Sequence, residues 1–354
     1  MTAKIPEVKA KVKPTKPWAP TTRERAVDIG AILLAILGTF IAVGLSELKG
    51  KLAYAGVFLL LIISINFIQN YLRSGIAAAK DSIASTFAVA GVLVTLLPIV
   101  SILYAIFERG KTGLKFNLFT SDMKLNGPND PLNQGGLLHA LVGSGIMVTI
   151  ALLISLPIGI LTAIYLTEIK GLLTRPIKFL VQSMSGVPSI VAGLFILSAI
   201  VFPITKTPSG LMGGFALAIL MIPTIARTSE EVLLLIPEDL REAGVALGGT
   251  QWRTISQIVV PAAKSGLITA VILGVARVAG ETAPLVLVSG GGDAVNLNPA
   301  AGPMGSFPFY IWKSFTFGTP ESIARAWAGI FILLLLIFAL FITARLLGGD
   351  RNKK

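Results

Sequence analysis

The chain has no cysteine and a single histidine among its 354 residues. It can therefore form no disulfide, thiol nucleophile or thiolate metal site. Charged residues are also scarce: they make up 14% of the chain, about half the usual share in soluble proteins. Hydrophobic residues make up 54%. A chain of this composition cannot bury its apolar residues in one water-soluble core, so we expect an integral membrane protein.

Sequence motifs of several enzyme classes are missing too. The glycine run at 290–292 does not begin a lysine-containing phosphate loop, so we predict that the chain does not hydrolyse ATP itself. No zinc motif or nucleophile elbow is present, which argues against a membrane hydrolase. The histidine, His139, has no metal-ligating partners near it in sequence, and we expect it to pack at a membrane interface. We predict a protein that is not an enzyme and binds no metal or cofactor itself.

Apolar segments dominate the chain after a basic tail, residues 1–25, which we expect to be disordered and cytoplasmic. A bilayer core needs about 20 helical residues. Only 211–226 is clearly shorter than this, unless its helix continues into the polar loop that follows. The predicted fold class is all-α and polytopic, with about eight transmembrane helices. The segments are 26–45, 52–72, 83–107, 137–166, 177–203, 211–226, 265–289 and 325–346.

The distribution of positive charge predicts the topology. With both termini in the cytoplasm, most Lys and Arg residues lie on the inner side, as the positive-inside rule requires. This places the polar connection 108–134 outside and the connection 227–264 inside. The inner connection is unusually acidic, which the positive-inside rule does not explain. Its acids are Glu230, Glu231, Glu238, Asp239 and Glu242.

Proline recurs inside the apolar segments from the third to the seventh. Proline lacks a backbone donor and its ring clashes with the preceding turn, so kinked or locally unwound helices are expected. Kinks of this kind favour a transporter only modestly. The residues are Pro98, Pro157, Pro188, Pro223 and Pro284.

The acidic connection has the pattern of a helix, a glycine turn and a second helix. Pro237 suits a first helical position, and the acids after it complement the helix dipole. Gly248 and Gly249 then predict a turn, and Thr250 can cap a second helix that runs to Pro261. The first helix carries an apolar stripe, so it could lie on a membrane or in a protein groove. Membrane-surface helices are normally rich in Lys and Arg, so its acidity favours a protein partner.

The spacing of six residues in this connection resembles the EAA loop of ABC-importer permeases. Gly244 replaces the usual second alanine and Val260 the usual leucine. The resemblance implies a type I importer permease core and a coupling helix that docks on a cytoplasmic ATPase subunit. The matching residues are Glu242, Ala243, Gly244, Gly248, Ile258 and Pro261.

Two opposite charges, Arg277 and Glu281, lie within the apolar segment 265–289. A charge at the bilayer centre costs about 2.5–3.5 kcal/mol on insertion scales. Residues at i and i+4 share a helix face, so the two can pair. They could brace the helix bundle. Alternatively, Arg277 could face a polar pathway for an anion, since its planar fork of donors matches phosphate oxygens, with Glu281 holding it in place.

The segment around this pair, 276–285, resembles the signature of PstA-type permeases of phosphate-specific ABC importers, and 186–193 resembles a block shared with the PstC-type sister permease. The resemblance covers about residues 83–346. It implies half of a pathway for inorganic phosphate in a bacterial cytoplasmic (inner) membrane. The implied partners are a PstC-type permease, two PstB-type ATPase subunits that use ATP and Mg, a PstS-type extracytoplasmic phosphate-binding protein and membrane lipid, with no nucleic acid.

Residues 26–72 depart from this resemblance, because such permeases usually have six membrane helices. We expect the extra hairpin to be an accessory element before a permease domain at 83–349. Asn66, Gln69 and Asn70 are its most polar cluster. Three other functions stay open. They are an ABC permease for another oxyanion (phosphonate, sulfate or molybdate), an ion-coupled secondary transporter, and a membrane structural or assembly protein.

Overall fold

The computed structural model describes residues 22–46 and 50–348 of the chain. It divides into two compact units, Met1–Ile102 and Leu103–Lys354, which are described one at a time. The described residues form helices and no strand, as predicted. Most of the expected basic tail, 1–25, lies outside the described residues. The expected domain boundaries stay a prediction.

The first unit contains helix α1, Thr22–Leu45, and most of helix α2, Lys51–Gly113. The α2 backbone leaves helical geometry at Gly75, with φ 83° and ψ −172°. The Asn66 amide donates to the Thr86 hydroxyl over 3.2 Å, whereas 20 residues of straight helix would separate them by about 30 Å. Therefore α2 folds back near Gly75, which needs the left-handed φ that glycine tolerates.

The number of membrane spans is close to the prediction but does not reproduce it. Six described helices are long and apolar enough to cross a membrane, or seven if one bent pair forms a single span. The expected segments 52–72 and 83–107 both lie within α2. An eighth span requires α2 to cross twice, once on each side of Gly75, so the count of eight stays a prediction.

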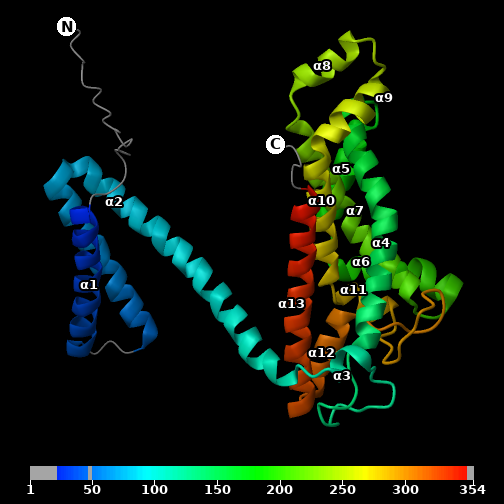
Figure 1. The fold of residues 1–354 in the computed structure, drawn as a ribbon, viewed down its shortest axis with the longest axis horizontal. Helices are drawn as coiled ribbons and strands as arrows, with labels where there is room; N and C mark the ends of the chain where they lie inside the picture. The colour runs from blue at the N-terminus through cyan, green and yellow to red at the C-terminus, as the bar shows by residue number, and fades with distance from the viewer. Residues whose placement is uncertain (1–21, 47–49, 349–354) are drawn as a thin grey trace, which may run out of the picture. The chain divides into compact units, whose positions relative to one another are not determined.

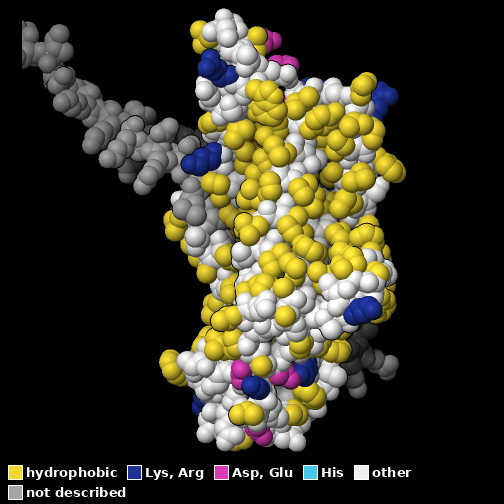
Figure 2. Space-filling model, turned by 90° about the vertical axis from the view of Figure 1, so that its right-hand side faces the viewer, with side chains coloured by type: hydrophobic (Ala, Val, Ile, Leu, Met, Phe, Trp, Pro, Cys, Tyr) yellow, Lys and Arg dark blue, Asp and Glu magenta, His cyan; other side chains and the backbone are white. Residues whose placement is uncertain are grey.

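The second unit is a bundle of helices with the loop helix α8 at one end (Figure 1). Hydrophobic side chains cover the middle of one face, and most charged side chains lie toward its two ends (Figure 2). This banding is expected of a protein whose middle contacts lipid or other apolar helices. In chain order its elements, where η denotes a π-helix, are α3 Asn117–Thr120, α4 Leu138–Ile164, η1 Tyr165–Ile169, α5 Thr174–Ser185, α6 Ser189–Ile196, η2 Leu197–Thr205, α7 Gly210–Leu234, α8 Glu238–Ala246, α9 Gln251–Thr254, η3 Ile255–Val259, α10 Val260–Ala279, α11 Ala283–Val288, α12 Phe307–Phe317 and α13 Pro320–Gly348.

Helix α7 is the centre of this bundle. The short apolar segment 211–226 does continue into the polar loop, giving a helix of 25 residues that ends at Leu234. Ile225 of α7 lies beside Gly159 of α4 and Gly274 of α10, and a Cβ at either glycine would approach it within 2.7–2.8 Å. Small residues thus let three membrane helices approach closely.

The chain between α5 and α6 is broken rather than merely kinked. The two helices, with η2, form a pair bent by 104°. Pro188 is the N-cap of α6, with ψ 136°, and its ring restricts the preceding residue to extended conformations. The interruption expected at this proline is confirmed, and the continuous span 177–203 is not found.

The boundaries predicted for the helix 265–289 are wrong at both ends. Pro261 does not end a helix, because the chain stays helical from Gln251 to Ala279. The π-helical turn η3 precedes the proline and is a geometry that can accommodate a missing backbone donor. The helix ends at Ala279, and Gly280 follows with non-helical geometry. Pro284 then lies in the first turn of the separate short helix α11.

The aromatic residues of α12 lie partly inside the bundle and partly on its surface. Phe307 and Tyr310 are buried in a cluster with residues of α4 and α13, whereas Trp312, Phe315 and Phe317 are exposed. The ring of His139 packs edge-on against Tyr310, with centroids 5.5 Å apart. His139 therefore packs within the bundle, as expected, and its location at a membrane interface stays a prediction.

Arg325 fastens the loop between α3 and α4 to the start of α13. Its side chain is 2% exposed, and its guanidinium donates to the carbonyls of Asp130, Pro131 and Gln134 at 2.7–3.1 Å. A fourth contact reaches the Pro128 carbonyl at 3.4 Å. One buried cation therefore satisfies several carbonyls of an irregular loop.

We expect Arg325→Gln to release this loop. Losing charge-assisted hydrogen bonds, each worth about 1.5–3 kcal/mol, should raise the open fraction of the loop at least about 10-fold. Trypsin cleavage after the exposed Lys124 in the membrane-embedded protein should accelerate accordingly. Arg109→Gln is the matched control, because that exposed arginine forms a cation–π contact with Trp327 and no ion pair within the part of the chain that the structure describes. An unchanged cleavage rate in Arg325→Gln would contradict the clamp.

Candidate functional site

The acidic connection folds as predicted into a helix, a glycine turn and a second helix. Helix α8 begins directly after Pro237. Gly248 has φ +82°, a conformation that favours glycine. The Thr250 hydroxyl caps α9 by accepting from the Arg253 N–H over 3.3 Å. The helix start, the glycine turn and the Thr250 cap together form a loop that places α8 at one end of the bundle (Figure 1).

Residues of the EAA-like pattern that are distant in sequence pack together in this loop. Gly244 is the one buried residue of α8. A Cβ at Gly244 would lie 2.7 Å from Cδ1 of Ile258 and 2.8 Å from Cγ2 of Thr254. The departure from the usual alanine therefore has a physical reason, because an alanine would force Thr254 or Ile258 to shift. Nothing in the structure explains Val260.

Most of α8 and its surroundings are exposed and unpartnered by the rest of the chain. Glu242 and Ala243 are exposed, and Glu242 makes no ion pair within the described residues. Large apolar side chains are exposed beside these acids. They are Leu240, Val245, Leu247 and Trp252. This mixture of acidic and apolar groups is suited to a complementary protein surface.

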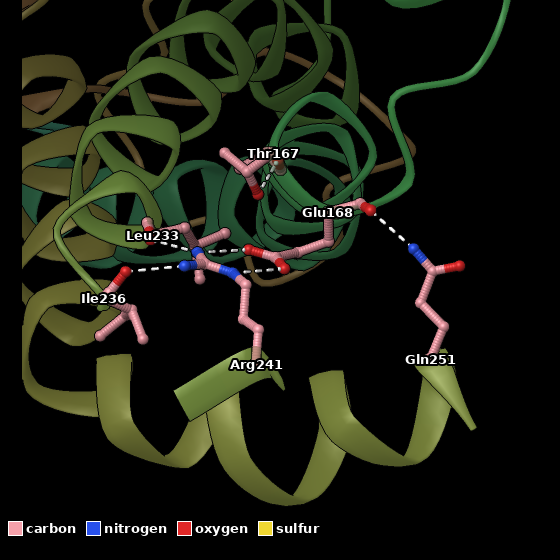
Figure 3. Close-up of polar contacts among 7 residues, drawn as sticks. Thr167, Glu168, Leu233, Ile236, Arg241 and Gln251 are labelled. Atoms are coloured by element: carbon pink, nitrogen blue, oxygen red, sulfur yellow. Dashed lines mark hydrogen bonds and ion pairs between the residues drawn. The ribbon is translucent and has the colours of Figure 1, made fainter. Parts of the chain in front are cut away.

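The cation of this helix, Arg241, is fully engaged in an interaction that the sequence did not predict (Figure 3). Its Nε and Nη2 donate to the two carboxylate oxygens of Glu168 at 2.9 and 2.8 Å. Its Nη1 and Nη2 also donate to the carbonyls of Ile236 and Leu233 at 2.7 and 2.9 Å. The Glu168 side chain is 5% exposed. Its carboxylate raises the pKa of Arg241 above the ordinary value.

A hollow of about 600 Å³ lies between α8, α9 and the end of η1. Glu168, Arg241 and Glu242 line it, together with apolar residues of α8 and η3. Since Arg241 is already paired with Glu168, the charges left without an ion pair around the hollow are carboxylates. The surface presented by α8 is therefore net negative.

The membrane charges Arg277 and Glu281 do not form the predicted helical pair. Helix α10 ends at Ala279, so Glu281 lies in the break before α11 rather than one turn further along the same helix. No ion pair joins the two residues in the part of the chain that the structure describes. Hydrophobicity alone could not reveal the break, although Gly280 and Pro284 were signals of it.

Arg277 instead contacts a threonine of the central helix. Its Nη1 donates to Oγ1 of Thr224 over 2.8 Å, and the side chain is exposed on the surface of the chain. Since this is the one side-chain hydrogen bond of Arg277 within the described residues, most of its donors remain available to an anion. The sequence did not predict Thr224 as the partner of Arg277. The adjacent Pro223 was the one local indication that this part of the helix is unusual.

Comparisons with known proteins identify a family and several named relatives. Residues 155–351 match the family described as binding-protein-dependent transport system inner membrane component. The phosphate transport system permease protein PstA 1 of Mycobacterium tuberculosis (strain CDC 1551 / Oshkosh) is 34% identical over 269 residues, which cover 76% of this chain and 88% of the relative.

Two further relatives are also named phosphate transport system permease protein PstA. The PstA protein of Pasteurella multocida is 36% identical over 77% of this chain and 96% of the relative. That of Haemophilus influenzae is 38% identical over 69% of this chain and 85% of the relative. Among solved structures, an inward-facing form of the MetNI methionine ABC transporter overlaps with a TM-score of 0.47 at 20% identity, over 60% of this chain and 93% of that chain. From the family match and these relatives, the chain belongs to the binding-protein-dependent transport system inner membrane components.

Proposed function

We propose that the chain is a transmembrane permease subunit of an ATP-driven inorganic phosphate importer. The observation that carries the proposal is its 34–38% identity to proteins named as phosphate transport permeases, over most of both chains. The exposed, acidic loop helix and the arginine on the surface of the bundle support it. The chain is a multi-pass inner membrane protein, and we place both termini in the cytoplasm.

The complete importer would contain several other subunits. The chain would supply one half of the pathway, and a PstC-type permease would supply the other. Two PstB-type ATPase subunits would bind ATP and Mg, and one would receive α8. A PstS-type binding protein would deliver phosphate from outside. In this assembly the chain itself performs transport and no catalysis.

The division of tasks within the chain follows from its geometry. Closure of the ATPase subunits on ATP would displace α8, which projects from the bundle and is accessible to a partner. The displacement would switch the pathway between its inward-facing and outward-facing states. Phosphate released by the binding protein would then pass Arg277, whose side chain is exposed on the surface of the chain.

Reconstitution of the assembled importer in proteoliposomes tests this function. ATP-dependent uptake of radiolabelled phosphate is expected when the ATPase subunits and the binding protein are present. Excess unlabelled phosphate should abolish uptake, whereas sulfate, molybdate or a phosphonate should not. Competition by one of these would support the other-oxyanion alternative. Uptake that needs an ion gradient rather than ATP would indicate a secondary transporter.

The N-terminal hairpin gives a separate prediction. Deleting residues 1–72 removes α1 and the first arm of α2, including Asn66, the partner of Thr86. We expect a lower yield of assembled importer because the remaining arm loses its packing. The KM for phosphate should stay within about twofold, since no pathway residue is removed. A changed substrate preference would refute the accessory role.

A further inference from the structure

One partly buried ion pair lies where the loop helix meets the closely packed helices α4 and α7. Glu168 belongs to η1, the continuation of α4, and Arg241 belongs to α8. The Leu233 and Ile236 carbonyls that Arg241 contacts lie at the C-terminal end of α7. A cation that donates to carbonyls at the C-terminal end of a helix caps the helix. Arg241 thus fastens α8 to α4 and α7 at one point (Figure 3).

Apolar packing alone would hold α8 weakly. Gly244 is its one buried residue, and the neighbours of Gly244 are Thr254 and Ile258 of α9 and η3, not residues of α4 or α7. Packing on Thr254 and Ile258 therefore attaches α8 to the long helix that contains α10, whereas the polar contacts of Arg241 attach it to α4 and α7. Gln251 adds a bond from α9 to the same place, since its amide donates to the Glu168 carbonyl over 2.7 Å.

Helix α7 connects this point with the membrane arginine. Thr224, the partner of Arg277, precedes Leu233 by nine residues on the same helix, a distance of about 13 Å. A helix of this length that is packed on several sides moves as a unit. Displacement of its cytoplasmic end therefore also displaces Thr224.

We propose that Glu168 and Arg241 are positioning residues that transmit the movement of α8 to α4 and α7, and through Thr224 to Arg277. The proposal rests on the proposed function, since it assumes that an ATPase moves α8. The planar fork of arginine on a carboxylate resists rotation as well as separation, which suits a joint that must transmit a displacement. Without the pair, α8 can move while α4 and α7 stay in place.

The test uses the assembled importer with Glu168→Gln or Arg241→Gln. The ATPase subunits should still co-purify and hydrolyse ATP, but phosphate transported per ATP hydrolysed should fall roughly 10-fold, within the usual range of coupling effects. The double variant should be no worse than either single one, since the two residues act as a unit. Merely lower stability would reduce the amount of importer and leave this ratio unchanged.

Arg227→Gln is the matched control, because Arg227 forms an exposed i,i+4 pair with Glu231 on α7. It should keep the wild-type ratio. An unchanged ratio in both Glu168→Gln and Arg241→Gln would overturn the proposal, as would an equal loss in Arg227→Gln.

A second measurement does not depend on the substrate. The chain lacks cysteine, so Leu273→Cys introduces its only thiol. Leu273 is 37% exposed and lies one turn before Arg277 on the same helix face. Its alkylation rate should differ between nucleotide-free and ATP–vanadate-trapped importer, and Arg241→Gln should remove the difference. A persisting difference would refute the transmission role, even if the transported anion proved not to be phosphate.

Discussion

Replacing Arg277 with glutamine is expected to abolish phosphate uptake while the importer stays assembled. The loss should be roughly 100-fold or more, the scale found when one preorganised donor is removed from a charged group in a low-dielectric site. Glutamine can still hydrogen-bond to Thr224, so the substitution mainly removes the positive charge. Uptake of radiolabelled phosphate, measured per assembled complex in proteoliposomes, checks this expectation.

The geometry strengthens the pathway interpretation of Arg277 over the bracing one. The bracing interpretation requires an ion pair between Arg277 and a carboxylate, and Arg277 forms none among the described residues. Its side chain is exposed on the isolated chain, where lipid contact would cost about 2.5–3.5 kcal/mol. A polar pathway shared with a second permease removes this cost.

Glu281→Gln is the informative companion to this experiment. Because Glu281 lies in the break between α10 and α11 and does not hold Arg277, its loss should reduce uptake less than the loss of Arg277. Equal losses would indicate that the two residues pair in another state of the importer. Normal uptake in Arg277→Gln would show that its charge serves no transport step.

The sequence was most informative where a feature depends on neighbouring residues. Long apolar stretches must become membrane helices, because only helices satisfy their own backbone within lipid. The turn at Gly248 and the cap at Thr250 also follow from local chemistry, and both are present. The break after Ala279 was not predicted, because the residues on either side of it are as apolar as those of a continuous helix.

Contacts between distant segments could not be predicted. Arg241 and Glu168 are 73 residues apart, and Arg277 and Thr224 are 53 apart. Neither pairing follows from spacing, since it depends on how α4, α7 and α10 pack. The sequence offers one hint for the first pair, since an arginine within an acidic helix is expected to pair with a carboxylate. It does not indicate which of the many possible carboxylates is the partner. Only the fold selects Glu168.

Charge reversal on the loop helix, Glu242→Lys, is expected to weaken docking of the ATPase subunits. With Arg241 neutralised by Glu168, the free charges of α8 are Glu238, Asp239 and Glu242. A partner groove that fits this surface carries positive charge, and like charges placed opposite each other cost several kcal/mol. Co-purification of the ATPase with the permease should fall at least about 10-fold, and uptake should fall with it.

Glu231→Lys is the matched control for this reversal. Glu231 is an exposed acid in the same connection, but it belongs to α7 and its partner is Arg227. Its reversal should leave co-purification close to the wild-type level. If Glu242→Lys leaves both assembly and transport unchanged, α8 is not the docking element.

The same substitution also separates a protein partner from a membrane surface. A helix that lies on anionic lipid gains affinity, by about 1 kcal/mol, for each lysine added near the surface. If α8 lay on the membrane, Glu242→Lys would therefore stabilise its position and leave the ATPase bound. If α8 lies in a basic protein groove, the added lysine repels its partner. The two arrangements predict opposite signs for one change at one residue, so co-purification of Glu242→Lys decides between them.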